Sequence, residues 1–287
     1  MSWADPFARN RDSAAMKKRL KLALILLVLA GAGLVVWQAL LPSEPRYQGK
    51  PLSLWLGGRD PFSMTEEQRL GLDEALAHMG TNAIPTLLRM LKARDSKTLL
   101  KLVGLAQKQH LISARYVPAE IRRAQAVYGL NWMQTRMIVP AVVQIYEDCT
   151  SPPSQIAAAR VLADLGPNAE EALPSLLRGL TSTNEWVLGN TIYAIGLINL
   201  VRPHPRECVP ALVRLLNNPS HVVRARAANA LGHFGPAAKE AVPGLKQLKT
   251  DVDKEVRDYS EYALRSIDPQ SAESQLEPSG TPAQRPR

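Results

Sequence analysis

The sequence predicts an all-α protein: a solenoid of about five helical hairpins preceded by a single transmembrane helix. Three observations lead to this prediction. A helix-stopping residue followed by a proline recurs along the chain, as internal repeats do. The residues after each of these prolines have the apolar spacing of a helix. A run of twenty residues near the N-terminus carries no charge.

The uncharged run, LALILLVLAGAGLVVWQALL, covers residues 22–41. As a helix it could span a hydrocarbon core of about 30 Å. It exceeds the apolar region of a signal peptide, which is about 7–15 residues long. We therefore expect an uncleaved anchor, although the stretch LAGAG leaves cleavage open.

Basic residues immediately before the run predict its orientation. Four of them are close together: Lys17, Lys18, Arg19 and Lys21. By the positive-inside rule, residues 1–21 form a short basic cytoplasmic tail and the bulk of the chain lies across the membrane. We expect a single-pass protein of the bacterial inner (cytoplasmic) membrane, with its solenoid in the periplasm.

We interpret residues 42–65 as a juxtamembrane linker and an N-terminal cap. The stretch YQGKPLSLWLGG (47–58) contains three leucines and Trp55. The open edge of a first repeat needs covering, and we prefer this role for Trp55 over a place in the membrane interface. Ser63 and Glu66 have the spacing of a capping box that starts the solenoid.

The solenoid is predicted over residues 66–268, where each repeat has a stop and a start. A Gly or Asn that can adopt a left-handed conformation ends the first helix of each repeat. These residues are Gly80, Asn131, Gly166, Asn199 and Gly235. A proline, suited to a first helical turn, then starts the second helix. These prolines are Pro85, Pro140, Pro174, Pro210 and Pro243.

Apolar residues follow each proline at helical spacing, as Leu176, Leu177 and Leu180 follow Pro174. One hairpin cannot bury such a stripe, so neighbouring hairpins must stack. No segment of any length alternates with period two, and strands are therefore not expected.

The stretch VVRARAANALGHFGPAAKEAVPGLKQL resembles a HEAT repeat of the type named after phycobilisome lyases. The whole chain is similar to membrane-anchored bacterial HEAT-repeat proteins, closely in the second half of residues 66–268 and loosely in the first half. The resemblance implies a HEAT-like α-solenoid, a fold that usually serves as a binding scaffold. It does not imply lyase activity, because no residue set suited to attaching a tetrapyrrole is found.

The repeat register selects a candidate partner-binding groove. The fourth residue after each helix-starting proline is long and polar, and three positions earlier there is a small or hydroxyl-bearing residue. The long residues are Arg89, Gln144, Arg178, Arg214 and Gln247. By resemblance to HEAT arrays, this row would face the concave side, where it could contact the carbonyls or carboxylates of a peptide. An ordinary exposed helix face would look the same.

A longer interval between the first two stops contains KTLLKLVGLAQKQHLI (97–112), which we expect to be an inserted amphipathic helix. Its apolar residues predict a buried stripe with lysines opposite. A candidate basic patch comprises Lys97, Lys101, Lys108, Arg122 and Arg123. It is either a solvated face or a contact for anionic lipid headgroups or an acidic partner. Residues 92–123 hold eight basic and two acidic residues of a chain with net charge +9, so the charge is local and no nucleic-acid partner is expected.

Catalytic and metal-binding patterns are lacking. His204 and Cys208 are close in sequence but have no further ligands beside them. Cys149 and Cys208 belong to different repeats and are expected as thiols. No phosphate loop, nucleophile elbow or HExxH motif occurs. We expect no catalytic, cofactor-binding or metal-binding residue, no cofactor and no small-molecule substrate.

These features predict a non-catalytic, membrane-anchored scaffold that binds a protein or peptide through its concave helical surface. The alternative is an accessory or regulatory subunit of a membrane-bound enzyme or secretion complex, and a lyase or hydrolase comes third. The tail, residues 269–287, is rich in Pro, Ser and Gln and is expected to be disordered.

Overall fold

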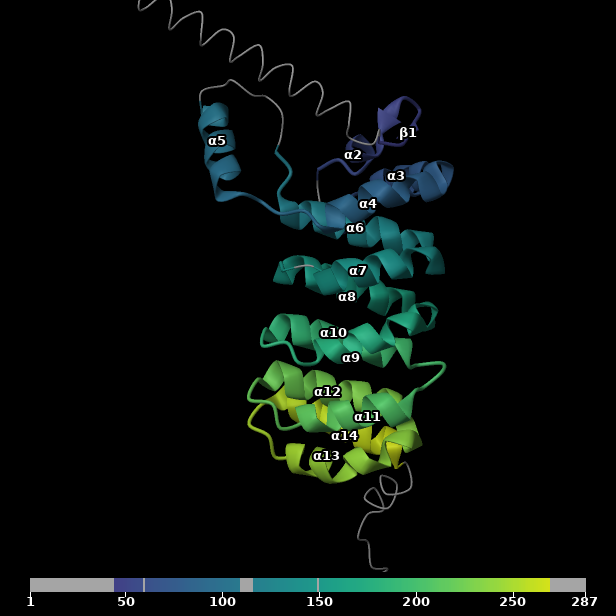
Figure 1. Cartoon of the computed structure of the whole chain (residues 1–287), viewed down its shortest axis with the longest axis vertical. Coiled ribbons are helices and arrows are strands. Elements are labelled where there is room, and N and C mark those ends of the chain that lie inside the picture. The colour runs from purple at the N-terminus through teal and green to yellow at the C-terminus, as the bar shows by residue number, and fades with distance from the viewer. Residues whose placement is uncertain (1–43, 59, 109–115, 149, 269–287) are drawn as a thin grey trace, which may run out of the picture. The chain divides into compact units, whose positions relative to one another are not determined.

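The computed structural model describes residues 44–58, 60–108, 116–148 and 150–268 (Figure 1). The predicted cytoplasmic tail, the anchor and the C-terminal tail all lie outside the described residues. Within the described ranges, no helix has the length and apolar character needed to cross a bilayer. The anchor therefore stays a prediction.

The helices of the described unit form two layers of a repeat solenoid. First helices stack on one another in chain order: α6 (Ala119–Met133), α8 (Pro152–Leu165), α10 (Glu185–Ile198), α12 (His221–His233) and α14 (Lys254–Ile267). Each second helix packs against the first helix of the next repeat: α4 (Ile84–Leu91), α7 (Val139–Asp148), α9 (Leu173–Gly179), α11 (Pro205–Leu215) and α13 (Val242–Leu248). The predicted all-α repeat solenoid is confirmed.

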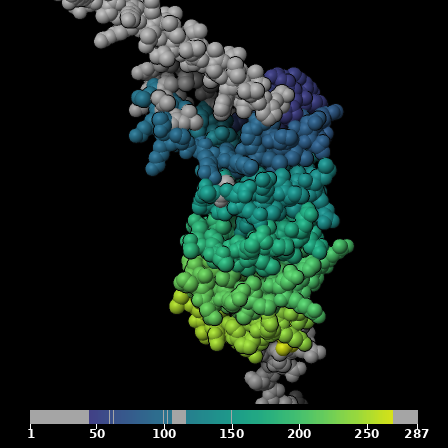
Figure 2. All heavy atoms as spheres, in the orientation of Figure 1, coloured from purple at the N-terminus to yellow at the C-terminus, as the bar shows by residue number. Residues whose placement is uncertain are grey.

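One cluster of buried apolar side chains extends through the stack, from Leu52 to Ile267. In Figure 2 successive repeats are seen as consecutive bands of colour. Their side chains fill the spaces that separate the ribbons in Figure 1. Alanines such as Ala158 and Ala227 are fully buried in the first helices, where small side chains let neighbouring helices approach closely. Each fully buried leucine contributes about 2 kcal/mol of transfer free energy. The repeats therefore supply each other's core, as expected for a solenoid.

The predicted glycine stops end their helices. Gly80, Gly166 and Gly235 have φ of +52°, +53° and +53°. With ψ near −139° and −130° at the first two, the backbone lies in a region that only glycine enters without strain. Short 3-10 segments then lead to the second helices: η2 (Gly80–Ala83), η4 (Gly166–Ala172) and η5 (Gly235–Ala241).

The prediction that two asparagines end their helices in the left-handed conformation is wrong. α6 continues past Asn131 to Met133, and Gln134 adopts the left-handed conformation with φ 44° and ψ 34°. Asn199 ends α10 with φ −86° and ψ 2°. Its side chain explains the difference: Nδ2 donates to the Ile195 carbonyl at 2.8 Å, and Oδ1 accepts from the His204 N–H at 2.7 Å. A side-chain cap there replaces the left-handed one.

Substitutions at two of these stops are expected to act in opposite directions. Gly166→Ala places a Cβ on backbone that L-residues avoid and is expected to lower the unfolding free energy by about 2 kcal/mol. Gln134→Gly relieves a strained left-handed residue and is expected to raise it by about 0.5 kcal/mol. Urea titrations of the two variants would measure both changes, and a Gly166→Ala variant as stable as wild type would contradict the assigned stop.

Four of the five predicted prolines lie in the first turn of a second helix, but Pro210 does not. The four are Pro85, Pro140, Pro174 and Pro243. α11 begins five residues before Pro210, at Pro205, and Pro210 lies inside it. The stretch HPRECVP supplies two prolines. The earlier one, Pro205, follows His204, whose backbone N–H donates a hydrogen bond to the Asn199 side chain. Pro210, inside α11, has no N–H to donate, and its ring crowds the carbonyl of the preceding turn.

An N-terminal hairpin precedes the first repeat. β1 (Arg46–Tyr47) pairs antiparallel with β2 (Lys50–Pro51), although no strand was expected. The connecting residues, Gln48 and Gly49, both have positive φ, as a tight two-residue turn requires. The pairing is too short to produce a detectable alternation of apolar residues.

The segment after this hairpin packs on the first repeat. Leu52 in α2 (Leu52–Trp55) is fully buried, as is Leu56. A Cβ at Gly71 of α3 (Glu66–Met79) would lie 3.4 Å from the Trp55 ring. A 3-10 turn, η1 (Pro61–Ser63), leads into α3. The capping box that starts α3 is formed by Thr65 and Gln68, two residues after the predicted pair of Ser63 and Glu66.

The inserted helix is α5 (Lys97–Lys108), and residues 109–112 of the predicted span lie outside the described residues. The predicted burial of its apolar stripe is wrong at two positions. Leu100 is 44% exposed and Leu105 is 57% exposed. Spacing alone predicted an apolar face but not whether another element covers it.

Candidate functional site

The structure places the predicted groove residues one on each second helix. All five long side chains, from α4, α7, α9, α11 and α13, are exposed. The five residues are Arg89, Gln144, Arg178, Arg214 and Gln247. We call this set the second-helix row. Of the five, Arg178 has the most interactions with a neighbouring repeat.

On each second helix, the residue three positions before the member of the row was predicted to leave room for a partner. The structure gives these residues a role in packing instead. Thr86 and Ser175 are buried, and the Ser175 hydroxyl contacts Arg178 within the protein. At Gly244, an added Cβ would lie 2.9 Å from Cδ1 of Leu216, the residue that caps the C-terminus of the preceding second helix. Small residues at these positions therefore serve packing between the protein's own elements.

A pocket of about 490 Å³ surrounds Arg178. α7, α8, α9, the loop after α9 and the start of α10 all contribute to it. Its lining comprises Tyr146, Glu147, Gln155, Ser175, Arg178, Gly179, Thr181, Ser182 and Val187. We call it the Arg178 pocket. Most of these side chains carry hydrogen-bonding groups, so the pocket is suited to a polar ligand.

Two opposite charges lie at the mouth of the Arg178 pocket. The Arg178 guanidinium forms an ion pair with Glu147 and donates to Ser175 Oγ at 3.0 Å. The hydrogen bond from Ser175 and the ion pair with Arg178 lower the pKa of Glu147 below its usual value. Glu147 is therefore charged at neutral pH, and both side chains are exposed to solvent.

The inner wall of the pocket is held by hydrogen bonds between buried groups. The hydroxyl groups of Tyr146 and Thr191 are 2.7 Å apart, and Thr191 Oγ1 donates to the Val187 carbonyl at 2.8 Å. Burial raises the pKa of Tyr146, which stays protonated. A Cβ at Gly179 would lie 1.8 Å from the Tyr146 hydroxyl oxygen, so glycine is needed there. The glycine in the stretch LLRGL is a signal that another part of the chain approaches closely. The sequence does not show that Tyr146 is the residue that approaches.

A second pocket, of about 810 Å³, lies on the other side of the α10 N-terminus and shares Ser182 with the first. Trp186 is 59% exposed beside it, and Leu188, Pro219 and Val223 give it an apolar part. We call it the Trp186 pocket. Exposed tryptophans are frequent anchors in protein interfaces, and the repeat pattern did not point to this one.

The residues of the predicted basic patch have different surroundings. Lys97 and Lys101 are exposed on α5, whereas the side chain of Lys108 is not described. Arg122 forms an ion pair with Asp95 at 2.9 Å, and Arg123 donates to the Ala93 carbonyl at 2.6 Å. The two arginines therefore bind acceptors at the base of the insertion.

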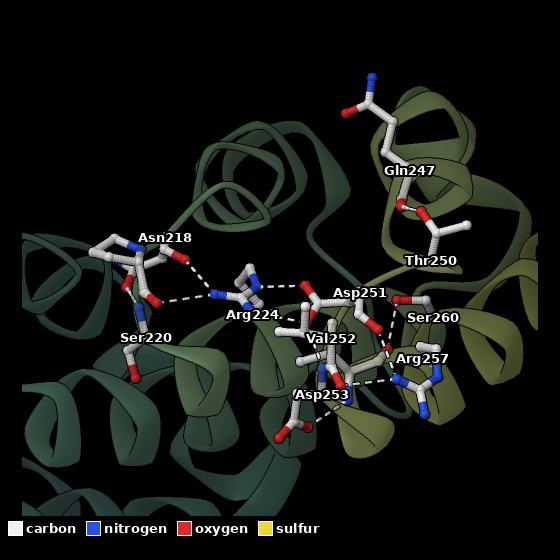
Figure 3. A network of polar contacts seen from close by, with 12 residues as sticks. Asn218, Ser220, Arg224, Gln247, Thr250, Asp251, Val252, Asp253, Arg257 and Ser260 are labelled. Atoms are coloured by element: carbon white, nitrogen blue, oxygen red, sulfur yellow. Dashed lines mark hydrogen bonds and ion pairs between the residues drawn. The ribbon is translucent and has the colours of Figure 1, made fainter.

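The loops that follow the second helices α11 and α13 share a polar network (Figure 3). Arg224 binds both carboxylate oxygens of Asp251, at 2.8 and 2.9 Å, and donates to the Asn218 carbonyl at 2.9 Å. Asp253 accepts from the Glu255 N–H at 2.9 Å and so caps α14. Asn184 caps α10 in the same way. We assign this network a structural role, because it holds successive repeats in register.

Two observations concern metal ligands and thiols in the described ranges. No group of three or more His, Cys, Asp or Glu residues in the described ranges is placed to hold a metal ion. Burial raises the pKa of Cys208 to about 11, so its thiol is protonated at neutral pH. Cys149 lies outside the described residues.

Comparison with known proteins supports the repeat architecture. Residues 173–265 match a family model described as HEAT repeats. The predicted HEAT-type repeats are thereby confirmed for the second half of the solenoid. No curated protein matches the chain.

Several solved structures resemble this chain. One is a designed armadillo repeat protein in complex with a peptide (KR)4, which is 16% identical. The match covers 76% of this chain and all of the designed one, with a TM-score of 0.44. Another is the complex of CpcE and CpcF of phycocyanin lyase from Nostoc sp. PCC7120, at 18% identity. It covers 79% of this chain and 80% of that one, with a TM-score of 0.42.

Proposed function

We propose that this chain is a non-catalytic, membrane-anchored scaffold that binds an extended segment of a protein partner on the face formed by its second helices. The observation that carries the proposal is the Arg178 pocket. It contains the middle residue of the second-helix row and lies between two successive second helices, α7 and α9. Its polar groups are held in place by the protein's own hydrogen bonds.

The chemistry of this pocket favours a peptide over a single strongly charged ligand. Arg178 and Glu147 offer a cation and an anion side by side. The hydroxyl groups of Ser175 and Thr181 donate to Glu147 and to the Arg178 carbonyl, and their oxygens can accept hydrogen bonds from a ligand. Such a mixed set suits the alternating N–H and C=O groups of a peptide backbone. The neighbouring Trp186 pocket would add an apolar anchor for a side chain.

The repeat architecture also favours this role. A stack of hairpins with one continuous core gives a rigid surface on which side chains recur at regular intervals. Because this surface is preorganised, the scaffold loses little conformational entropy when it binds an extended segment. The second-helix row would contact successive parts of the same segment.

The place of action follows from the predicted anchor. We propose that residues 22–41 hold the chain in the inner membrane of a bacterium, with the solenoid in the periplasm. Alkaline carbonate washing should leave the full chain in the membrane fraction. Alkaline phosphatase fused after residue 287 should be active, because that enzyme folds only outside the cytoplasm. Release by carbonate, or an inactive fusion, would contradict this location.

Charge reversal on the second-helix row is expected to weaken partner binding. The double variant Arg178→Glu/Arg214→Glu should bind about 30-fold more weakly, equal to about 2 kcal/mol, as arginines central to interfaces do. Quantitative mass spectrometry of proteins that co-purify with the full chain from solubilised membranes measures the loss.

The matched control is Arg160→Glu/Arg265→Glu, which makes the same charge change on exposed residues of the first-helix layer. It should retain the partner, and both variants should melt at the wild-type temperature within a few degrees. Equal recovery with both double variants would refute the second-helix face as the binding surface.

A further inference from the structure

The inserted helix α5 presents an exposed face that combines positive charge with apolar side chains. Lys97 and Lys101 are exposed, and Leu100 and Leu105 lie 44% and 57% exposed beside them. Separations of three and four residues place neighbours of this set on one side of the helix. The segment 97–108 contains no acidic residue.

The base of the insertion is closed by a cluster around Asp95, two residues before α5. Asp95 accepts hydrogen bonds from the Tyr116 hydroxyl and from the Ala119 N–H at 2.9 Å, and it pairs with Arg122. Although partial burial acts to raise it, these hydrogen bonds hold the pKa of Asp95 below its usual value. The chain therefore leaves the stack and returns to it at one point. α5 can contact another surface without disturbing the core.

We infer that the exposed face of α5 docks onto an anionic lipid surface. A basic helix with leucines beside its lysines is typical of segments that lie in a membrane interface. The leucines would enter the region between headgroups and acyl chains, while the lysine stems extend so that their ammonium groups stay at the phosphates. The inference stands apart from the Arg178 pocket and holds whether or not that pocket binds a peptide.

An acidic protein would attract the same lysines, but two observations favour lipid. The exposed face contains no aromatic side chain and no arginine, which are the residues that anchor most protein interfaces. The same chain carries the apolar run 22–41, which would bring the described unit to a membrane. Charge complementarity then assigns the face to anionic headgroups, at about 1 kcal/mol for each lysine near the surface.

A fluorescent label at position 104 tests the docking. An added Cβ at Gly104 has no atom within 4 Å, so Gly104→Cys is expected to be tolerated. The full chain, with Cys149→Ser to leave only the buried Cys208, is placed in nanodiscs of phosphatidylcholine with or without phosphatidylglycerol. An environment-sensitive dye at position 104 should shift to the blue and resist quenching by iodide only where phosphatidylglycerol is present.

Matched variants separate docking from general effects of charge and label. The same dye on Val252→Cys, at a residue 94% exposed, should remain accessible to iodide on both lipids. Lys97→Gln/Lys101→Gln should lower the ratio of docked to undocked chains about 30-fold. Lys246→Gln/Lys249→Gln, which removes two exposed lysines from the region of α13, should leave the ratio unchanged.

Two outcomes would overturn the inference. The first is a label at position 104 that stays as accessible to iodide as the label at position 252 on both lipids. That result would leave an acidic protein as the class of partner for α5. The second is equal protection with and without phosphatidylglycerol, because the lysines would then play no part.

Discussion

Replacing Asp251 by Asn is expected to lower the unfolding free energy by about 3 kcal/mol at neutral pH. The side chains of Arg224 and Asp251 are only 14% and 9% exposed, and they form two parallel hydrogen bonds (Figure 3). Removing the carboxylate leaves the Arg224 charge poorly solvated and without its counter-ion. Asp251 also accepts from the Asp253 N–H, so the loop before α14 loses order as well.

The loss is expected to depend on pH in a defined direction. Hydrogen bonds from Arg224 lower the pKa of Asp251 in the folded protein. A carboxyl with a depressed pKa stabilises the fold above its unfolded pKa of about 3.9, and this contribution disappears as the pH falls through the folded value. The difference between wild type and Asp251→Asn should therefore be constant near neutral pH and shrink below about pH 4.

Urea titration at several pH values measures this difference. Asp258→Asn is the matched control, because Asp258 pairs with Lys254 on the exposed surface of α14. Such a surface pair contributes less than about 1 kcal/mol, so this control should be nearly neutral. A loss of similar size in both variants would show that the Asp251 network does not hold the last repeats together.

Substituting Gly179 by Ala is expected to lower the unfolding free energy by about 2 kcal/mol, as overpacking a core does. The new Cβ would lie 1.8 Å from the Tyr146 hydroxyl oxygen and 2.8 Å from Cζ. Tyr146 is buried and bonded to Thr191, so its ring cannot move away without opening the core. Gly104→Ala is the control, since its Cβ meets no atom and alanine favours a helix.

A double-mutant cycle with Tyr146→Phe isolates the clash. Tyr146→Phe alone loses one hydrogen bond and is expected to lower the unfolding free energy by about 1 kcal/mol. It also removes the atom that the new Cβ would meet first. The double variant should therefore be less destabilised than the sum of the single variants, by about 1 kcal/mol or more. Additive losses would show that Gly179 and Tyr146 are not in contact.

The repeats could be predicted where local backbone chemistry decides the structure. Gly166 and Gly235 stop their helices because only glycine adopts the required φ without strain, and Pro174 and Pro243 suit a first turn wherever they occur. Pro210 misled the prediction because a second proline, earlier in the same segment, begins the helix instead.

The candidate site could be predicted only in part, because its geometry depends on contacts between repeats. The repeat register indicated Arg178 as an exposed residue on a second helix. It could not show that Glu147 of the preceding second helix would lie against it, or that Tyr146 would require a glycine at position 179. For α5, the spacing of Leu100 and Leu105 predicts an apolar face but not whether it is covered.

Site-specific photo-crosslinking tests the proposed binding face most directly. A benzophenone amino acid is placed in the full chain at Gln144 or Gln247 of the second-helix row, and at Arg160 or Glu261 of the first-helix layer, all four exposed. Irradiation of intact cells should crosslink a discrete partner from positions 144 and 247 and from neither first-layer position. Crosslinks confined to positions 160 and 261, or equal at all four, would contradict binding on the second-helix face.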